Sequence, residues 1–139
     1  MFYRQWTLYT CGTTVFRAVV REFNGKHISE NEAVELVGTT RKGTNFKQIE
    51  KALKDFNIGI DYFKEVTKTN IDAALDLGRW VAVADHDTWS YDHIFLVTGK
   101  WMGMYVVVDS LIGFPIMYTK NYVVKTARNA GFSIFKKVK

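Results

Sequence analysis

The hydrophobic pattern changes character part-way along the 139-residue chain, and this change limits the folds that the chain can adopt. Up to about residue 56, apolar residues recur every three or four positions, which is the period of an α-helix. From residue 80 onward, β-branched and aromatic residues form short runs between turn residues, which is typical of strands. Helices that precede strands indicate an α+β fold, in which N-terminal helices pack on a C-terminal antiparallel β-sheet.

Local signals place the individual elements. We expect helices at 11–23, from Ser29 to Gly38 with Glu32 completing a capping box, and from a Thr44 cap through the apolar stripe 46–56. The second half predicts an edge strand at 60–64, a helix capped by Asn70, strands at 80–84, 93–97, 105–109 and 132–135, and an ambiguous segment at 117–128 in which Thr119 could cap a helix.

The bulk composition is that of one ordinary folded domain spanning residues 1–139. A hydrophobic fraction of 47% supports a sizeable core. The sequence has no apolar run long enough for a membrane span and no signal-peptide core at its start. One cysteine excludes an internal disulfide and fits a reducing compartment, so we expect a soluble cytoplasmic protein.

The net charge of +5 raises the question of an acidic partner such as nucleic acid. The basic residues are dispersed, however. Lys47, Lys51 and Lys54 share one helix face with Glu50 among them, which is more typical of a solvated surface than of a phosphate-binding track. The sequence therefore does not favour nucleic-acid binding.

The only cysteine, Cys11, lies in the first turn of the first predicted helix, with Thr10 as its expected N-cap. Unpaired N–H groups at a helix start stabilise an anion, and a thiol there tends to have a lowered pKa. Gln5, six residues earlier, could donate a hydrogen bond to an oxyanion formed beside the sulfur. The alternative is that Cys11 is a small buried packing group, as unpaired cysteines often are.

A later hairpin supplies a second pair of candidate groups. If it is symmetric about Trp101, His93 lies directly opposite Asp109 on one face of the sheet, where the carboxylate could orient the imidazole. A one-residue slip would break this pairing. Either residue could instead be an ordinary strand-start histidine or a turn-forming aspartate.

A metal site is the competing use of this region. The residues that could supply it are Asp85, His86, Asp87, Asp92 and His93. Three of them are consecutive and diverge in an extended chain, and no helical His-x-x-x-His spacing is present. We therefore expect neither a metal nor another cofactor.

The combination resembles a known family. The chain resembles the papain-like cysteine peptidases in the order of its motifs. These are Gln5, Cys11-Gly12 at a helix start, His93-Ile94-Phe95-Leu96-Val97, and Val107-Val108-Asp109-Ser110. More narrowly, they resemble the bacteriocin-processing peptidases that cut after double-glycine leaders, over residues 5 to 115. The resemblance implies a papain-like fold and a Cys11–His93–Asp109 triad, with Gln5 in the oxyanion hole.

The function that we expect is that of a stand-alone cysteine peptidase acting on a peptide or protein. Trp6, Trp89 and Tyr91 could narrow the cleft and favour a small residue such as glycine beside the cut, although core packing explains each aromatic residue as well. Two alternatives remain open. One is a catalytically silent peptide-binding module, and the other is a related thiol acyl-transfer enzyme, such as a deamidase or transglutaminase.

Overall fold

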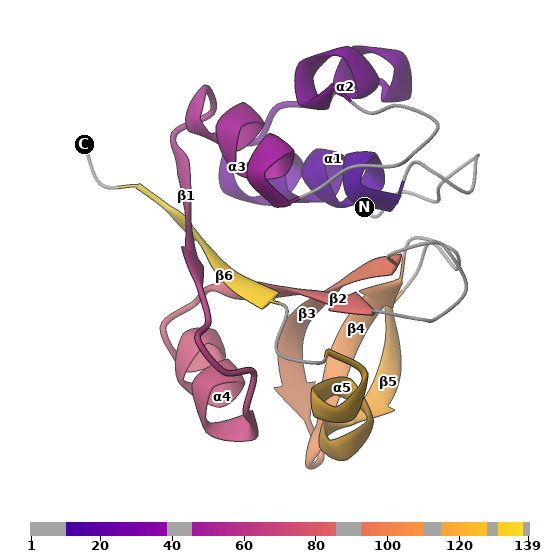
Figure 1. Cartoon of the computed structure of the whole chain (residues 1–139), viewed down its shortest axis with the longest axis vertical. Coiled ribbons are helices and arrows are strands. Elements are labelled where there is room, and N and C mark those ends of the chain that lie inside the picture. The colour runs from indigo at the N-terminus through magenta and orange to yellow at the C-terminus, as the bar shows by residue number, and fades with distance from the viewer. Residues whose placement is uncertain (1–10, 39–45, 86–92, 110–114, 128–130, 138–139) are drawn as a thin grey trace.

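The computed structural model describes residues 11–38, 46–85, 93–109, 115–127 and 131–137, and the account below is of these residues. They form five helices and a six-stranded antiparallel sheet (Figure 1), which confirms the α+β prediction. The elements are α1 (Cys11–Phe23), α2 (Glu30–Val37), α3 (Phe46–Lys54), β1 (Ile58–Tyr62), α4 (Lys68–Asp76), β2 (Trp80–Asp85), β3 (His93–Trp101), β4 (Met104–Asp109), β5 (Pro115–Thr119), α5 (Lys120–Ala127) and β6 (Gly131–Lys136).

The strand order is β1-β6-β2-β3-β4-β5, so β6 lies between two strands that precede it by many residues. Helices α1, α2 and α3 cover one face of this sheet, and α4 and α5 cover the other (Figure 1). The predicted first strand is confirmed as an edge strand, although it begins at Ile58 rather than at residue 60.

Helix α1 is the centre of the larger core. It has the predicted bounds, and its apolar side chains Val15, Phe16, Val19 and Val20, which recur at helical spacing, are all at most 3% exposed. They pack in one cluster with Ile94, Leu96 and Val108 of the sheet. Every side chain from residue 13 to 20 is buried, so this part of α1 is enclosed on all sides, and the helix reaches the surface at its last turn, where Arg21 and Glu22 are exposed.

Capping residues set several of the helix ends. Ser29 Oγ accepts from the Glu32 N–H at 3.2 Å, and Gly38 ends α2 in the left-handed conformation, both as predicted. Thr119 Oγ1 accepts from the Tyr122 N–H and caps α5. The prediction that Asn70 caps α4 is wrong, because Thr67 Oγ1 accepts the bond from the Asn70 N–H and the helix begins at residue 68.

The described helices include none with the length and apolar character required to cross a membrane.

Candidate active site

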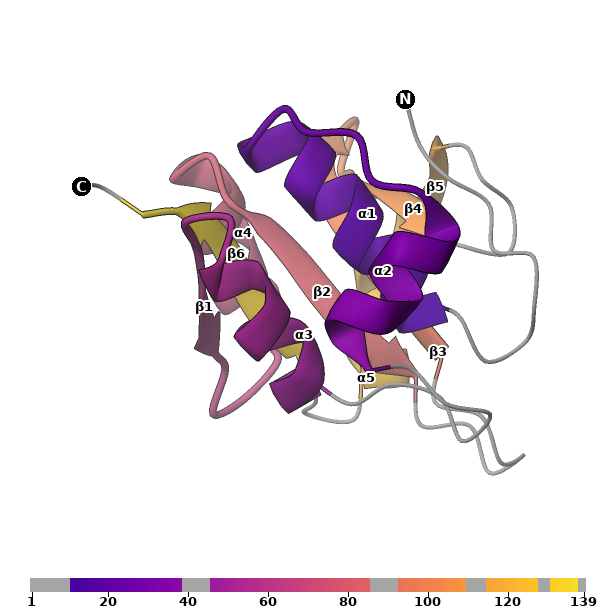
Figure 2. The ribbon, with the colours of Figure 1, turned by 90° about the horizontal axis from the view of Figure 1, so that it is seen from above.

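The structure places the three predicted triad residues at the ends of three elements. Cys11 is the first residue of α1, His93 is the first residue of β3, and Asp109 is the last residue of β4. Helix α1 packs against β3. In both views, the start of α1 lies by the end of the sheet at which β3 begins and β4 finishes (Figures 1 and 2). The fold therefore directs three distant segments to one region.

The predicted direct pairing of His93 with Asp109 is wrong. Asp109 pairs with Phe95, and His93 pairs with Asp85 of β2. The hairpin turns at Met102-Gly103, where both residues have positive φ, rather than about Trp101. A bulge between Val97 and Gly99 then shifts the register again.

The observed partner of Asp109 on β3 is two residues from the predicted one. Because this shift is even, position 109 still faces the same side of the sheet as position 93. Positions 93 and 95 share one face of β3, and position 109 lies opposite 95. Positions 93 and 109 are therefore diagonal neighbours on the same face, which in antiparallel ladders lie about 7–8 Å apart. Phe95 packs in the cluster beneath α4 and α5, so this is the face opposite to the one that α1 covers, and the start of α1 meets these two positions at the end of the sheet rather than across its face.

Several predicted residues lie outside the described part of the chain. These are Gln5, Trp6, Trp89 and Tyr91, together with His86, Asp87 and Asp92 of the competing metal site. The side chains of Cys11, His93 and Asp109 also lie outside it, so their contacts remain predictions. Within the described residues, no group of three or more His, Cys, Asp or Glu side chains could hold a metal ion.

The surroundings of α1 hold its N-terminus in place. Arg17 Nε, in the interior, donates to the Ile28 carbonyl at 2.8 Å and so ties the helix to the segment before α2. Thr13 and Thr14 in its first turn are buried as well. That turn contains no acidic side chain, so no carboxylate of the helix neutralises the partial positive charge at its N-terminus.

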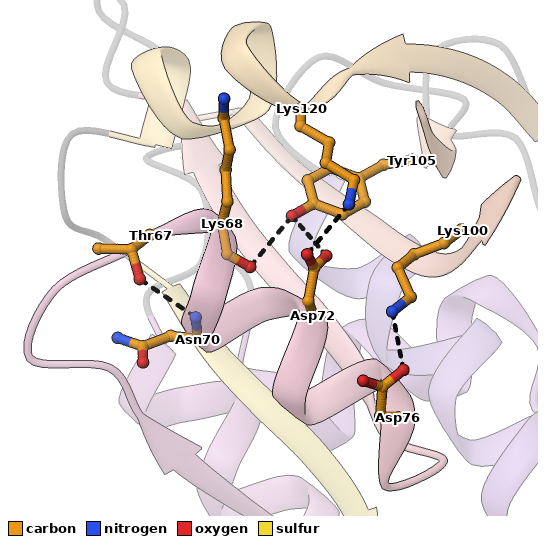
Figure 3. Close-up of polar contacts among 8 residues, drawn as sticks. All are labelled: Thr67, Lys68, Asn70, Asp72, Asp76, Lys100, Tyr105 and Lys120. Carbon is orange, nitrogen blue, oxygen red and sulfur yellow. Dashed lines mark hydrogen bonds and ion pairs between the residues drawn. The ribbon is translucent and has the colours of Figure 1, made fainter. Parts of the chain in front are cut away.

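A polar cluster that the sequence analysis missed lies on the face of the sheet that α4 and α5 cover, opposite to α1 (Figure 3). The fully buried Tyr105 of β4 donates its hydroxyl to Asp72 Oδ1 of α4 at 3.0 Å. Lys120 of α5 donates to Asp72 Oδ2 at 3.0 Å, and its ammonium lies 5.3 Å from the centre of the Tyr105 ring. We call Asp72, Tyr105 and Lys120 the polar clamp, because they join two helices to one strand.

The ionisation of the clamp suits a structural role. Burial raises the pKa of Tyr105, and the neighbouring Asp72 carboxylate raises it further. Partial burial of Asp72 opposes its ionisation, but hydrogen bonds from Lys120 and Tyr105 outweigh this effect and lower its pKa. A tyrosine that resists ionisation and a carboxylate that is already paired are poorly suited to moving protons near neutral pH.

Comparison with solved structures identifies the fold. The peptidase domain of Streptococcus ComA, a bifunctional ABC transporter of a quorum-sensing pathway, matches with a TM-score of 0.81 and 21% identity over 96% of this chain and 94% of that chain. A double-glycine motif protease from an AMS/PCAT transporter, solved with its leader peptide, matches with a TM-score of 0.71 and 11% identity over 97% of this chain and 89% of that chain. A C39-like peptidase from Bacillus anthracis matches with a TM-score of 0.67 and 11% identity over 100% and 96%.

The chain has the C39 papain-like peptidase fold. The expected likeness to the double-glycine leader peptidases is thereby confirmed at the level of structure. No family model and no curated protein sequence matches the chain. Because these structural neighbours are at most 21% identical, the chemistry has to be argued from the residues of this chain.

Proposed function

We propose that this protein is a cysteine peptidase whose nucleophile is Cys11. The observation that carries the proposal is the convergence of three element ends. The helix that begins at the only cysteine points its start toward the end of the sheet where His93 and Asp109 stand. A thiol at a helix start, a histidine and a carboxylate are the groups that thiol acyl transfer requires.

In the proposed reaction, His93 accepts the proton of the Cys11 thiol, and the thiolate attacks the carbonyl carbon of a peptide bond. The oxyanion that forms accepts hydrogen bonds from the Cys11 backbone N–H and the Gln5 side-chain amide, which lowers the barrier by a few kcal/mol. His93 then protonates the departing amine, leaving a thioester on Cys11. Water, deprotonated by His93, attacks the thioester and releases the carboxylic acid and the thiol.

Asp109 orients His93 in this scheme. The diagonal relation of positions 93 and 109 supports that role, since diagonal neighbours remain within reach of long side chains. Asp109 also stabilises the imidazolium that forms when His93 accepts the proton. A thiol nucleophile has to remain reduced, and we therefore place the protein in the cytoplasm.

The proposed substrate is a peptide or protein segment. One structural neighbour is a double-glycine motif protease in complex with its leader peptide, which supports a peptide substrate here. Trp6, Trp89 and Tyr91 would narrow the cleft beside Cys11, so that a small residue such as glycine precedes the cut.

Alkylation tests the nucleophile. Because the chain has one cysteine, the rate of reaction with iodoacetamide reports on Cys11 alone. We expect the wild type to react with iodoacetamide at pH values well below about 8.5, the ordinary pKa of a thiol. The His93→Ala variant should move the pH midpoint of this reaction toward that value. His27→Ala is the matched control, since His27 lies exposed in the connection after α1. A transition near pH 8.5 in both the wild type and His93→Ala would rule out an activated nucleophile.

Product analysis then separates the peptidase from its alternatives. A peptide library with internal glycine pairs should yield new amino termini with the wild type and none with Cys11→Ala. Ammonia release from glutamine without a new terminus would indicate a deamidase. Tight peptide binding by both the wild type and Cys11→Ala, with no product from either, would indicate a binding module.

A further inference from the structure

A second carboxylate-bearing residue stands nearer to His93 in the sheet than Asp109 does. Asp85, the last residue of β2, is the direct partner of His93, the first residue of β3. Directly opposed residues of an antiparallel pair lie on the same face, with Cβ atoms about 4.5–5.5 Å apart. Asp109 is a diagonal neighbour of His93, at about 7–8 Å. Asp85, which the sequence suggests only as a possible metal ligand, is therefore well placed to act on the histidine.

The ladder that carries Asp85 is regular and buried. Five consecutive residue pairs join β2 to β3, from Val81–Val97 to Asp85–His93, without a register shift. Those of their side chains that the structure describes are at most 2% exposed, namely Val81, Ala82, Val83, Ile94, Phe95, Leu96 and Val97. The ladder that carries Asp109 contains a bulge instead. Because a close-packed ladder permits little backbone adjustment, it holds position 85 firmly opposite position 93.

Position 85 lies at the end of the sheet rather than in its middle. The pairing of β2 with β6 stops at Val83, which is the partner of Gly131. Beyond Val83, the described partner of β2 is β3 alone. In both views, β2 ends and β3 begins by the start of α1 (Figures 1 and 2). Asp85 therefore stands at the same end of the sheet as His93 and the start of the helix that Cys11 begins.

Asp85 and Asp109 are the only charged residues of the two strands beside β3. Strand β2 reads WVAVAD and β4 reads MYVVVD, so the one charged residue of each is its last. The other titratable residues of β3, β4 and the elements packed on them are Cys11, Arg17, Arg21 and Glu22 of α1, Lys68, Asp72 and Asp76 of α4, Lys100 of β3, Tyr105 of β4, Tyr118 of β5, and Lys120, Tyr122 and Lys125 of α5. In strand register, His93 is thus flanked by two carboxylates and by no cation.

We propose that Asp85 is a second positioning residue of the peptidase and that its carboxylate stabilises the imidazolium form of His93 from β2. This rests on the proposed function, in which His93 accepts the proton of Cys11. The ring that has gained this proton is positively charged, and an opposite charge within about 4–6 Å favours that form. Asp85 therefore favours the thiolate–imidazolium pair over the neutral thiol–imidazole pair, and it acts through His93.

An ordinary structural role for Asp85 is the alternative. Every residue of β2 before it is apolar, and a strand that leaves the core commonly ends in a polar residue that begins the next turn. Asparagine would serve that role as well as aspartate, because both suit such positions. The stabilisation of a cation, by contrast, requires the negative charge. Replacing aspartate by asparagine at position 85 therefore separates the two roles.

The test is an NMR titration of the His93 ring in the full chain carrying Cys11→Ala, with EDTA present to remove metal ions. Without Cys11, the reading does not depend on whether the protein cleaves peptides. The His93 signals are assigned by their loss in His93→Ala. Asp85→Asn should lower the pH midpoint of the His93 titration by about half a unit or more, because it removes a negative charge opposite the ring. Asp85→Glu keeps the charge and should restore most of this loss.

Two further carboxylates complete the comparison. Asp109→Asn should also lower the midpoint, and the double variant with Asp85→Asn should lower it further than either change alone. Asp76 is the matched control, since its carboxylate lies 2.7 Å from Lys100 Nζ. Lys100 is seven residues from His93 along β3, or about 23 Å. Asp76→Asn should leave the midpoint unchanged.

A kinetic reading links Asp85 to catalysis. In the chain that retains Cys11, Asp85→Asn should lower kcat about tenfold and change KM little, because His93 takes up its proton after the substrate has bound. Asp85→Glu should recover most of the rate. If the chain cleaves no peptide, the titration still decides whether Asp85 acts on His93. Cleavage together with a His93 midpoint that ignores Asp85 would overturn the present proposal and leave the peptidase proposal standing.

A carboxyl ¹³C titration needs no change at position 85 and so covers the case in which Asp85→Asn fails to fold. In the Cys11→Ala chain, the Asp85 carboxyl carbon should show a step at the midpoint of His93, and His93→Ala should remove that step. Absence of the step would overturn the proposal. So would a midpoint in Asp85→Asn that stays within about 0.2 pH units of the parent chain, since an opposed charge should move it further.

Discussion

The two faces of the sheet hold their helices by different means. On one face, α1 packs in the larger apolar cluster, and the Arg17 side chain ties it to the Ile28 carbonyl. On the other face, α4 and α5 pack on a smaller apolar cluster and are joined through the polar clamp. The face that α1 covers is therefore held by packing, whereas the face that carries the polar clamp, the clamp face, is held partly by charge. Helix α1, which begins at the proposed nucleophile Cys11, lies on the packed face, and the stability of that face should vary little with pH.

The largest expected effect is on the packed face. Phe16 is fully buried and lies edge-on to Phe56, with ring centres 5.8 Å apart. Phe16→Ala should lower the free energy of unfolding by about 3–5 kcal/mol, because it leaves a cavity beside α1. Urea denaturation measures this, with the 41% exposed Leu36→Ala as a control that should cost about 0.5 kcal/mol or less. A loss below about 1 kcal/mol for Phe16→Ala would mean that packing does not hold α1.

The clamp should show an intermediate effect. Tyr105→Phe keeps the ring and removes only the hydroxyl that donates to Asp72 at 3.0 Å. The expected cost is about 1–2 kcal/mol, because Asp72 loses a donor in a partly buried site. Tyr122→Phe, at a half-exposed tyrosine of α5, should cost much less in the same denaturation assay. Equal effects of the two substitutions would show that the buried hydroxyl contributes nothing specific.

Acid should weaken the clamp face selectively. The pKa of Asp72 is lowered in the folded protein, so its stabilising effect is present above the unfolded value of about 3.9 and is lost as pH falls through the lower folded value. Unfolding free energy measured from pH 5 down to pH 2.5 should therefore fall more steeply for the wild type than for Asp72→Asn. The expected difference is below about 1 kcal/mol, since the pair is partly exposed. Parallel curves would contradict the assignment.

The smallest effect is expected at the second ion pair of this face. Lys100 and Asp76 lie 2.7 Å apart, but the Asp76 side chain is 67% exposed. Asp76→Asn should change the unfolding free energy by less than about 0.5 kcal/mol, because solvent screens such pairs. A loss comparable to that of Tyr105→Phe would show that this pair belongs to the same network as the clamp.

The helices could be predicted from sequence because their signals are local. The bounds of α1 followed from the spacing of Val15, Phe16, Val19 and Val20, and the end of α2 followed from Gly38. The exception within α2 is Leu36, which follows Ala33 at helical spacing and yet is 41% exposed. A helix of eight residues buries a narrow stripe, and here only Ala33 and Val37 fill it.

The register and the clamp could not be predicted in the same way. The His93–Asp109 alignment depended on a turn at Met102-Gly103, where methionine gives no sign of a left-handed conformation. The bulge that follows Val97 is likewise not marked in the sequence by any distinctive residue before Gly99. Asp72, Tyr105 and Lys120 are separated by more than a dozen positions each, and only the folded sheet brings them together.

The position of β6 has a consequence for synthesis of the chain. Residues 131–136 fill the space between β1 and β2, so neither of these strands has its neighbour on that side until the segment has left the ribosome. A nascent chain stopped before this point would expose two open strand borders, which invite pairing with other chains. We therefore expect ribosome-bound intermediates of this protein to need protection from aggregation until β6 is made.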